Sequence, residues 1–389
     1  MRIGVDAVCW ENKRGFGRFT RELLEALLEI DKINDYVFFV DRGTSGDAFP
    51  PRVQKIAAET QASPLAAASA NGRRSFADLW AMSRAVLRQR IDVFFFPAVY
   101  TYFPVFNRTK IVVTVHDVIA DHQPKLIFPN AKLKFFWKLK QNAAVRQADL
   151  VLTVSEHSKQ QIRKYFKLPE SSLRVVTEAA RPIFRALPEC NETNGVLAHY
   201  GLTPNEPFLL YVGGISPHKN LTTLIDAFKQ IGRNHSPVKL VLVGDYKSDP
   251  FFSAYPSLKK QISELNLSER VIFTGFVPDA DLVCLYNAAE ALVFPSLEEG
   301  FGLPAIEAMS CGTPVAASNS SSLPEVLGDA AVYFDPRNAQ NMAAAIEQIL
   351  NDGNLQQSMR RVGLARAKQF TWKKAAQETL NIFDELIRF

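Results

Sequence analysis

The 389-residue sequence lacks several features that would place it in a specialised class. Its four cysteines, Cys9, Cys190, Cys284 and Cys311, form no C-x-x-C pair, which argues against a zinc site or a redox motif and fits a reducing cytoplasm. No apolar run approaches the roughly 20 residues of a membrane span, and the N-terminal stretch lacks the apolar core of a signal peptide. The net charge of +5 permits anionic partners without requiring them. We therefore expect a cytoplasmic globular protein.

What the sequence does contain is an alternation of short apolar runs and amphipathic helices. The runs are rich in β-branched and aromatic residues, which indicates parallel strands buried on both faces. They cover residues 2–8, 36–41, 92–97, 111–116, 149–155, 208–213, 239–244, 270–275, 291–295 and 314–318. Helical segments 19–30 and 220–231 each place their apolar residues along one stripe. The alternation predicts an α/β protein with doubly wound parallel sheets.

The domain organisation follows from length and from one break in the pattern. A chain this long suits two cores, and the helical and strand periods are lost between residues 181 and 206. We place a linker at 186–206, between an N-terminal domain, 1–185, and a C-terminal domain, 207–370. A last helix, 371–389, follows Thr371 as its N-cap and is expected to cross back to the first domain. Ligands of such sheets bind beyond the C-terminal strand ends, so two facing sheets predict a cleft.

Residues 296–315 hold two acids in an unusual setting. Glu299 falls in a glycine-containing loop, and Glu307 lies about one turn into the helix that follows, with Pro304 near its start. Carboxylates accept hydrogen bonds from hydroxyl pairs, so both acids can bind one sugar or ribose. The alternative is a capping acid beside a solvated helix acid. A glycosidase pair is disfavoured because the surroundings suit phosphate, which a hydrolase does not need.

Three further motifs each follow a predicted strand. Gly15 and Gly17 in "NKRGFGRF" allow a tight turn and a close approach of backbone N–H groups to an anion, or form a plain strand–helix turn. His116 in "VVTVHDV" suits an acid–base or hydrogen-bonding group, or a structural histidine. Gly214 and Lys219 in "YVGGISPHKN" suit a phosphate holder, or an exposed lysine beside a loop.

These segments, in this order, resemble glycosyltransferase family 4, the large retaining family with the GT-B fold. The resemblance covers nearly the whole chain, and the E-x7-E element from Glu299 to Glu307 is its most specific mark. The segments "GRFTRELL", "TVHD", "DLVLTVSEHSKQQI", "YVGGISPHKN" and "LPEVLGDAAVYFDP" also look like family segments. The resemblance implies two Rossmann-like doubly wound parallel-sheet domains facing each other across a cleft, with the nucleotide sugar on the C-terminal domain and the acceptor on the N-terminal domain.

The resemblance also implies roles for individual residues. In the catalytic group, Glu299 contacts the donor sugar hydroxyls, Lys219 binds the diphosphate, and His116 hydrogen-bonds the sugar near the reacting carbon. The remaining donor-binding positions approach the diphosphate, the base or the ribose. They are Gly15, Gly17, Gly214, Phe276, Val277, Phe301, Gly302, Leu303 and Glu307.

One departure from the family pattern concerns the diphosphate. Family members often carry an arginine shortly before the lysine, whereas this chain has none there, so Arg14 or Arg18 becomes the candidate replacement. We expect no metal and no cofactor, because the only D-x-D letters, at 279–281, open a helix away from the expected site.

The resulting hypothesis is retaining, metal-independent transfer of a hexose, with mannose favoured, from GDP-mannose or a UDP-sugar to a saccharide or lipid-linked saccharide. A nucleotide-sugar 2-epimerase of the same fold and a non-catalytic nucleotide-sugar-binding protein remain alternatives. The segment 130–146 interleaves basic and aromatic residues, so it is either a helix that buries its aromatics or a peripheral contact with an anionic membrane. Nucleic-acid binding has little support, since the basic residues form no long stripe.

Overall fold

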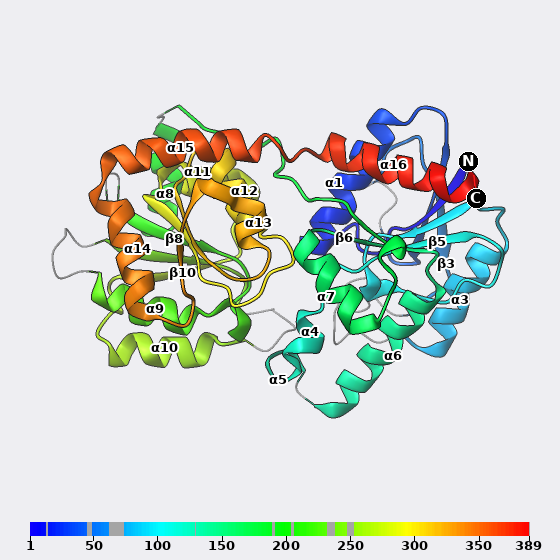
Figure 1. Cartoon of the computed structure of the whole chain (residues 1–389), viewed down its shortest axis with the longest axis horizontal. Coiled ribbons are helices and arrows are strands. Elements are labelled where there is room, and N and C mark those ends of the chain that lie inside the picture. Colours follow the sequence, from blue (N-terminus) through cyan, green and yellow to red (C-terminus); the bar gives the residue numbers. More distant parts are fainter. Residues whose placement is uncertain are drawn as a thin grey trace. The chain divides into compact units, whose positions relative to one another are not determined.

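The computed structural model describes residues 1–12, 15–44, 49–61, 74–128, 130–188, 191–203, 206–231, 238–246 and 253–388. The chain forms two compact units, and each is built on one parallel sheet (Figure 1). Unit 1 consists of Met1–Glu178 with Thr371–Phe389, and unit 2 consists of Ala179–Phe370.

Unit 1 is a seven-stranded parallel sheet of order β3-β2-β1-β4-β5-β6-β7. Its strands are β1 (Arg2–Asp6), β2 (Asp35–Asp41), β3 (Gln54–Ala58), β4 (Val93–Phe96), β5 (Lys110–Thr114), β6 (Leu150–Thr153) and β7 (Leu173–Val175). Its helices are α1 (Gly15–Ile30), α3 (Phe76–Leu87), η2 (Val99–Thr101), α4 (Ile119–His122), α5 (Pro124–Ile127), α6 (Ala131–Gln147), α7 (Glu156–Phe166), η3 (Glu170–Ser172) and α16 (Trp372–Arg388).

Unit 2 is a six-stranded parallel sheet of order β10-β9-β8-β11-β12-β13. Its strands are β8 (Phe208–Val212), β9 (Lys239–Val243), β10 (Val271–Gly275), β11 (Ala291–Phe294), β12 (Val315–Ser318) and β13 (Ala331–Phe334). Its helices are α8 (Asn191–His199), η4 (Pro217–Lys219), α9 (Leu221–Gln230), α10 (Tyr255–Glu264), α11 (Asp279–Ala288), α12 (Leu303–Ser310), α13 (Leu323–Leu327), η5 (Gly328–Ala330), α14 (Ala339–Asn351) and α15 (Gly353–Ala367).

The first six strands of each unit follow the doubly wound order 3-2-1-4-5-6. In that order the chain winds first to one side of the sheet and then to the other. The switch lies between β1 and β4 in unit 1 and between β8 and β11 in unit 2. The predicted pair of Rossmann-like parallel sheets is therefore confirmed.

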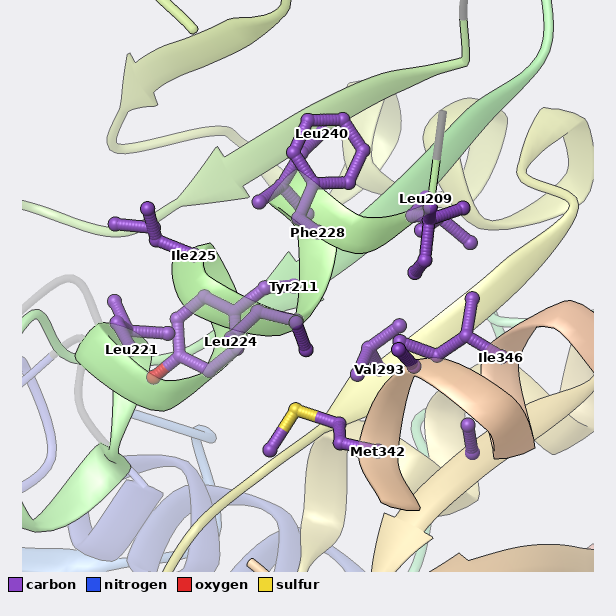
Figure 2. Packing of buried hydrophobic residues seen from close by; sticks show 14 of the residues in the cluster. Leu209, Tyr211, Leu221, Leu224, Ile225, Phe228, Leu240, Val293, Met342 and Ile346 are labelled. Carbon is purple, nitrogen blue, oxygen red and sulfur yellow. The ribbon is translucent and has the colours of Figure 1, made fainter. Parts of the chain in front are cut away.

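The core of unit 2 shows why its strands are continuous apolar runs. Leu209 and Tyr211 of β8 pack with α9 and α14 on one face, and Figure 2 shows them beside Phe228 and Ile346. The alternate residue Leu210 is also fully buried. Because side chains of a strand alternate between faces, both faces of this sheet are covered by helices.

Three strands were not predicted from the sequence, and all three lie at sheet edges: β3, β7 and β13. An edge strand is paired on one side only, so its sequence need not be a continuous apolar run. The middle residues of β3 and the last two of β7 are only half-buried or exposed. Their mixed sequences, "QKIAA" and "LRV", therefore give no strand signal.

The boundary between the units lies at Glu178 and Ala179, upstream of the linker placed at 186–206. Residues 191–199 in that predicted linker form α8, which contacts α11 and belongs to unit 2. The helix carries Asn, Thr and Gly within nine residues, which hides its period.

The terminal helix α16 belongs to unit 1 and lies along α1 (Figure 1). Its start is capped by Thr371, whose Oγ1 accepts a hydrogen bond from the N–H of Lys374 at 3.2 Å. Phe383 packs its ring against Phe95 of β4, with centroids 5.5 Å apart. The amphipathic α16 thus completes the core of unit 1.

Candidate functional site

The loops after β8 and β11 of unit 2 lie next to each other because these strands are neighbours in the sheet. The loop after β8 carries Gly214 and ends in η4 with Lys219. The loop after β11 carries Glu299 and leads into α12. The carboxyl edge at a switch point is where open α/β sheets bind their ligands.

Lys219 and Glu299 meet directly at this edge. Lys219 Nζ lies 2.6 Å from Glu299 Oε1, although the residues are 80 positions apart in the sequence. The two side chains keep 17% and 10% of their surface exposed, so the pair is sheltered and still accessible from solvent. A cation and an acceptor-only carboxylate thus face one point of the sheet edge.

The main chain around Glu299 is held by two serines that the sequence analysis did not single out. Ser321 Oγ accepts from the N–H of Glu299 and donates to its carbonyl oxygen, both at 2.8 Å. Ser322 Oγ lies 3.0 Å from the carbonyl oxygen of Glu299 and 3.2 Å from that of Phe301. Ser321 has a left-handed backbone with φ of 59°, unusual for a residue other than glycine. The run of serines before α13 was the feature of the sequence that could have indicated this role.

Glu307 lies on α12, as expected, but is almost fully buried at 2% exposure. Its Oε2 accepts a hydrogen bond from the hydroxyl of Tyr286 on α11 at 3.1 Å. Tyr286 itself is fully buried. The contact ties α12 to α11, and the role of Glu307 toward a ribose remains a prediction.

Gly302 is the N-cap of α12 and adopts φ of 102°. A Cβ atom at this position would lie 2.6 Å from Cδ2 of Leu323, so both the backbone angle and the packing require glycine. Pro304 stands in the first turn of α12, as predicted, where its missing N–H costs no hydrogen bond. Phe301 and Leu303 beside it are buried.

Phe276 and Val277 follow β10 at the same carboxyl edge, two strands away from β8. Phe276 is 52% exposed, whereas Val277 is buried at 4%. An exposed aromatic ring at a ligand edge suits contact with a planar base. The base-binding role assigned to these residues stays a prediction.

His218 does not replace the arginine that family members often carry shortly before the lysine. Burial lowers the pKa of His218 to about 3, and the neighbouring Lys219 charge adds to the effect, so the imidazole is neutral at physiological pH. Within the described residues its Nδ1 has no hydrogen-bond partner. Its carbonyl oxygen accepts from the N–H of Leu297 at 3.0 Å, which links the two loops. Of the two proposed replacements, Arg14 lies outside the described residues, and Arg18 belongs to α1 of unit 1.

In unit 1, His116 follows β5 and has contacts at both ring nitrogens. Nε2 lies 3.1 Å from the carbonyl oxygen of Pro97 and therefore carries the hydrogen, since a carbonyl only accepts. Nδ1 faces Glu178 Oε1 at 3.5 Å, and the Phe19 ring packs edge-on at 4.7 Å. A ligand of His116 would have to replace one of these contacts, and the longer one to Glu178 is the weaker.

Gly15 and Gly17 lie within the first turn of α1, which begins at Gly15 rather than at residue 19 as predicted. A Cβ on Gly17 would lie 2.1 Å from the carbonyl oxygen of Asn12, so this glycine is required by the turn itself. A Cβ on Gly15 would meet nothing within 4 Å. Between them, Phe16 stacks on Tyr100 with centroids 4.5 Å apart.

The carboxylates of the D-x-D letters have structural partners. Asp279 opens α11 and pairs with Arg181 at 2.7 Å, and Asp281 accepts from the Tyr200 hydroxyl at 2.8 Å. Across the described part of the chain, no three His, Cys, Asp or Glu side chains group as metal ligands. In the same residues, no helix is both long and apolar enough to cross a bilayer.

Two family models match the chain and together cover most of it. "Glycosyltransferase Family 4" matches residues 14–178, and "Glycosyl transferases group 1" matches residues 198–366. The first match falls on unit 1 and the second on unit 2.

Individual proteins agree with these models. The O-antigen chain mannosyltransferase B of Escherichia coli is 35% identical over 282 residues, which is 70% of each chain. The serotype-specific mannosyltransferase WbdA of Escherichia coli is 30% identical over 289 residues, covering 72% of this chain but only 34% of WbdA. The solved structure of sucrose-phosphate synthase from Thermosynechococcus elongatus superposes with a TM-score of 0.77, covering 100% of this chain and 99% of that one at 21% identity. That last likeness establishes the fold.

Proposed function

The chain belongs to glycosyltransferase family 4, and on that premise we propose that it transfers mannose from a nucleotide diphosphate sugar to a saccharide hydroxyl, with retention of configuration. The enzyme class, glycosyltransferase, follows from the family itself. The observation that supports the proposed donor binding and sugar transfer is the contact between Lys219 and Glu299 at the β8–β11 switch point. A cation suits the diphosphate, and a carboxylate suits the sugar hydroxyls.

In this proposal the donor separates the ion pair and satisfies both of its members. Lys219 donates to a diphosphate oxygen, and Glu299 accepts from hydroxyls of the transferred sugar. The bond between the anomeric carbon and the phosphate oxygen breaks, and its electron pair leaves with the nucleotide. Lys219 stabilises the charge that develops there, the kind of electrostatic contribution that is worth about 10² to 10³ in rate.

The acceptor oxygen then forms its bond to the anomeric carbon on the face that the phosphate leaves. Its proton passes to the departing phosphate oxygen, which retains configuration without a protein nucleophile. The reaction needs no metal in this scheme, because a lysine and backbone N–H groups near Phe301, Gly302 and Leu303 carry the electrostatic work. The role of His116, a hydrogen bond to the sugar near the reacting carbon, remains a prediction.

Mannose is the favoured sugar because the relatives that match about 70% of this chain include an O-antigen chain mannosyltransferase and a serotype-specific mannosyltransferase. GDP-mannose is therefore the first donor to test, and UDP-sugars are the alternative. By the same argument the product belongs to polysaccharide assembly. The exposed Phe276 would lie against the base of either nucleotide.

A peripheral contact with an anionic membrane is part of the proposal and rests on α6. Phe135, Phe136 and Leu139 are 64%, 44% and 57% exposed, while Trp137 points inward at 3%. The exposed Lys132 and Lys138 flank these apolar side chains. An apolar strip with lysines beside it suits an anionic bilayer surface.

Vesicle co-sedimentation tests this contact. Phosphatidylglycerol vesicles at low salt should pellet the chain, and F135S/F136S should reduce the pelleted fraction several-fold. Neutral phosphatidylcholine vesicles are the control for charge. Failure of the unmodified chain to pellet with the anionic vesicles would exclude the membrane contact and leave the transferase proposal intact.

The central experiment is a donor panel with Lys219→Ala. The unmodified chain should convert GDP-mannose in the presence of a mannoside acceptor, and K219A should lower turnover by about 10² to 10³ with unchanged melting temperature. Lys260→Ala, at a side chain that is 78% exposed, is the matched control and should keep full activity. Near-normal turnover of K219A would disprove the role of the ion pair.

The two alternatives give different products. A nucleotide-sugar 2-epimerase would change the donor without any acceptor, which product analysis of donor-only reactions detects. A non-catalytic sensor would bind the donor, raise the melting temperature and yield no product with any acceptor. Inversion of the anomeric configuration in the product would contradict the retaining scheme.

A further inference from the structure

Helix α3 of unit 1 presents large apolar side chains on the side that faces away from its sheet. The helix contacts β2 and β3, and its inward residues Met82 and Val86 are buried. On the opposite side Phe76 is 90% exposed, Trp80 is 56% exposed and Leu87 is 48% exposed. Positions 76, 80 and 87 follow the helical period, so these three side chains form one stripe along α3.

Phe106, in the loop before β5, extends this stripe. Its side chain is 58% exposed, and its ring centroid lies 6.1 Å from that of Trp80. The loop is held against α3 by Ser83, whose Oγ lies 2.6 Å from the carbonyl oxygen of Pro104. The stripe and the loop therefore form one continuous surface. This surface, called the α3 patch below, consists of Phe76, Trp80, Leu87 and Phe106.

The α3 patch is about as large as the apolar part of a stable dimer interface. A buried aromatic side chain covers about 150 to 250 Å², so the exposed fractions of the three rings leave about 400 Å² of aromatic surface. A standard interface buries about 800 Å² on each partner, and about 65% of a homodimer interface is apolar. The three rings together with Leu87 therefore supply most of the roughly 500 Å² of apolar surface that one copy would contribute. Contiguous apolar patches of this size mark interaction sites.

The charges around the α3 patch favour a protein surface over a bilayer. The exposed cations on α3, at its C-cap and in the Phe106 loop are arginines, Arg84, Arg88 and Arg108. Arginine is enriched in protein interfaces and lysine is depleted, whereas α6 carries lysines beside its exposed aromatic residues. Arg84 follows Trp80 by four positions and so lies within the stripe itself. Hydrocarbon would bury this charge, but the ring of a partner protein would stack on it.

The order of residues along the stripe is complementary to itself when two copies of α3 run antiparallel. Phe76 then lies opposite Leu87 of the second copy, and Trp80 lies opposite Arg84 of the second copy. Two-fold symmetry repeats both contacts, because residue i contacts residue j and residue j contacts residue i. Each guanidinium gains the face of an indole ring. A parallel pair would instead place Arg84 against Arg84, and the two like charges would repel each other.

We propose that the chain forms a two-fold dimer in which the α3 patches of two copies pack against each other with their helices antiparallel. The proposal is independent of the transferase reaction, because no residue of the α3 patch has a role in donor or sugar binding. The exposed aromatic residues of α6 are not part of the contact, so each copy keeps the surface proposed to meet a membrane.

Sedimentation velocity of the full chain over a dilution series tests the proposal. The unmodified chain should pass from two copies per particle to one copy as it is diluted. Trp80→Ser should weaken the dimer by about 10³-fold, because loss of one central aromatic anchor weakens binding about 30-fold or more and each dimer contains two. Ile33→Ser, at an apolar residue that is 92% exposed and lies outside the α3 patch, is the matched control and should dimerise like the unmodified chain.

A pair of cysteines tests the antiparallel arrangement. Ala77 and Arg88 are exposed on one flank of α3, and each would face the other in the second copy. Glutathione disulfide should therefore link two copies of A77C/R88C by disulfides and be reduced to glutathione, above the background of the unmodified chain. A77C alone and R88C alone should not be linked, because equal positions of the two helices are then about 16 Å apart along the axis.

Each other outcome overturns the proposal. One copy per particle at every concentration would exclude the dimer, and a dimer that W80S leaves intact would use another surface. Efficient linking of A77C alone would mean that the helices run parallel. Phe106→Ser is the second variant if melting by circular dichroism shows that W80S is unfolded, and it should also weaken the dimer. A chain that stays monomeric and pellets with anionic vesicles less well as W80S would make the α3 patch a membrane surface instead.

Discussion

At the switch point of unit 2, the adjacent strands β8 and β11 lead to Lys219 and Glu299, which remain 17% and 10% exposed and neutralise each other. At the corresponding point of unit 1, β1 and β4 lead to Asp6 and Thr101, which are 1% and 2% exposed. There Thr101 Oγ1 donates to Asp6 Oδ2 at 2.5 Å. The same strand order thus presents an accessible ion pair in one unit and a buried, hydrogen-bonded acid in the other.

The comparison separates what topology decides from what side chains decide. The doubly wound order determines where a ligand can bind, because loops after adjacent strands on either side of the switch meet there. The side chains determine which ligand binds. In unit 2 they leave a lysine and a carboxylate accessible to a ligand, and in unit 1 they bury the acid.

The largest expected effect tests the accessible ion pair of unit 2. Glu299→Gln should lower turnover by about 10² to 10³, because the amide is uncharged beside Lys219 and replaces one acceptor oxygen by an NH₂ donor. If both residues act on one donor, the double variant K219A/E299Q should fall little below the worse single variant, since residues that act as a unit are not additive. Single-turnover rates of all four chains measure this coupling.

Additive losses would contradict the shared donor. If the two single effects multiplied in the double variant, Lys219 and Glu299 would act on independent steps. The unit 1 variant Asp6→Asn serves as the distant partner in a second cycle with E299Q, and that pair should be additive if the two edges contribute separately.

The next effect concerns stability in unit 1. Burial raises the pKa of Asp6 to about 7, against the lowering effect of the Arg74 charge. A folded pKa above the unfolded one of 3.8 means that the folded state binds the proton more tightly. The contribution of Asp6 to stability should therefore be full below pH 4 and be lost as pH rises toward 7, by roughly 4 kcal/mol at the top of this range.

Tryptophan fluorescence reads this change in unit 1 alone. All four tryptophans belong to that unit: Trp10, Trp80, Trp137 and Trp372. Urea unfolding followed by fluorescence should give a midpoint that falls between pH 4 and 7 in the unmodified chain and stays flatter in Asp6→Asn. An equally steep fall in the variant would show that another group titrates.

A smaller effect of opposite sign is expected in unit 2. The pKa of His218 is lowered by burial, from 6.5 to about 3, so the unfolded state binds the proton more tightly. The contribution of His218 to the stability of unit 2 should be full above pH 6.5 and be lost as pH drops toward 3, by roughly 2 kcal/mol at pH 5. Hydrogen exchange of β8 and α9 should quicken on acidification, and His218→Gln should remove that acceleration. If hydrogen exchange in the unmodified chain did not depend on pH after correction for intrinsic rates, the predicted contribution of His218 would be wrong.

How far the sequence could predict these two regions depends on burial. Strands such as 208–212 and 93–96 lie inside a sheet and are continuous apolar runs, so the pattern alone located them. The edge strands β3 and β7 alternate poorly and depend on a single neighbour, so only the tertiary structure defines them. The helix over 191–199 was missed because turn-forming residues occupy it.

The candidate site divides in the same way. Lys219 and Glu299 could be proposed because each follows a recognisable strand in a sequence motif, and parallel pairing brings their loops together. The contact of Glu307 with Tyr286, and the neutral state of His218, could not be predicted, because both result from packing between elements distant in sequence. The serines that hold the Glu299 loop carry no periodic signal at all.

The smallest effect tests those serines. Ser322 is fully buried, and its hydroxyl serves the carbonyl oxygens of Glu299 and Phe301, so Ser322→Ala should cost about 1 to 2 kcal/mol of stability. Because the loop then holds Glu299 less firmly, kcat should fall several-fold while binding of the free nucleoside diphosphate stays unchanged. Ser320→Ala, in the same serine run, is the matched control and should alter neither quantity. A loss of nucleotide affinity in S322A with unchanged kcat would contradict this role. The Ser322 hydroxyl would then support nucleotide binding, and Glu299 would be positioned by its pairing with Lys219 alone.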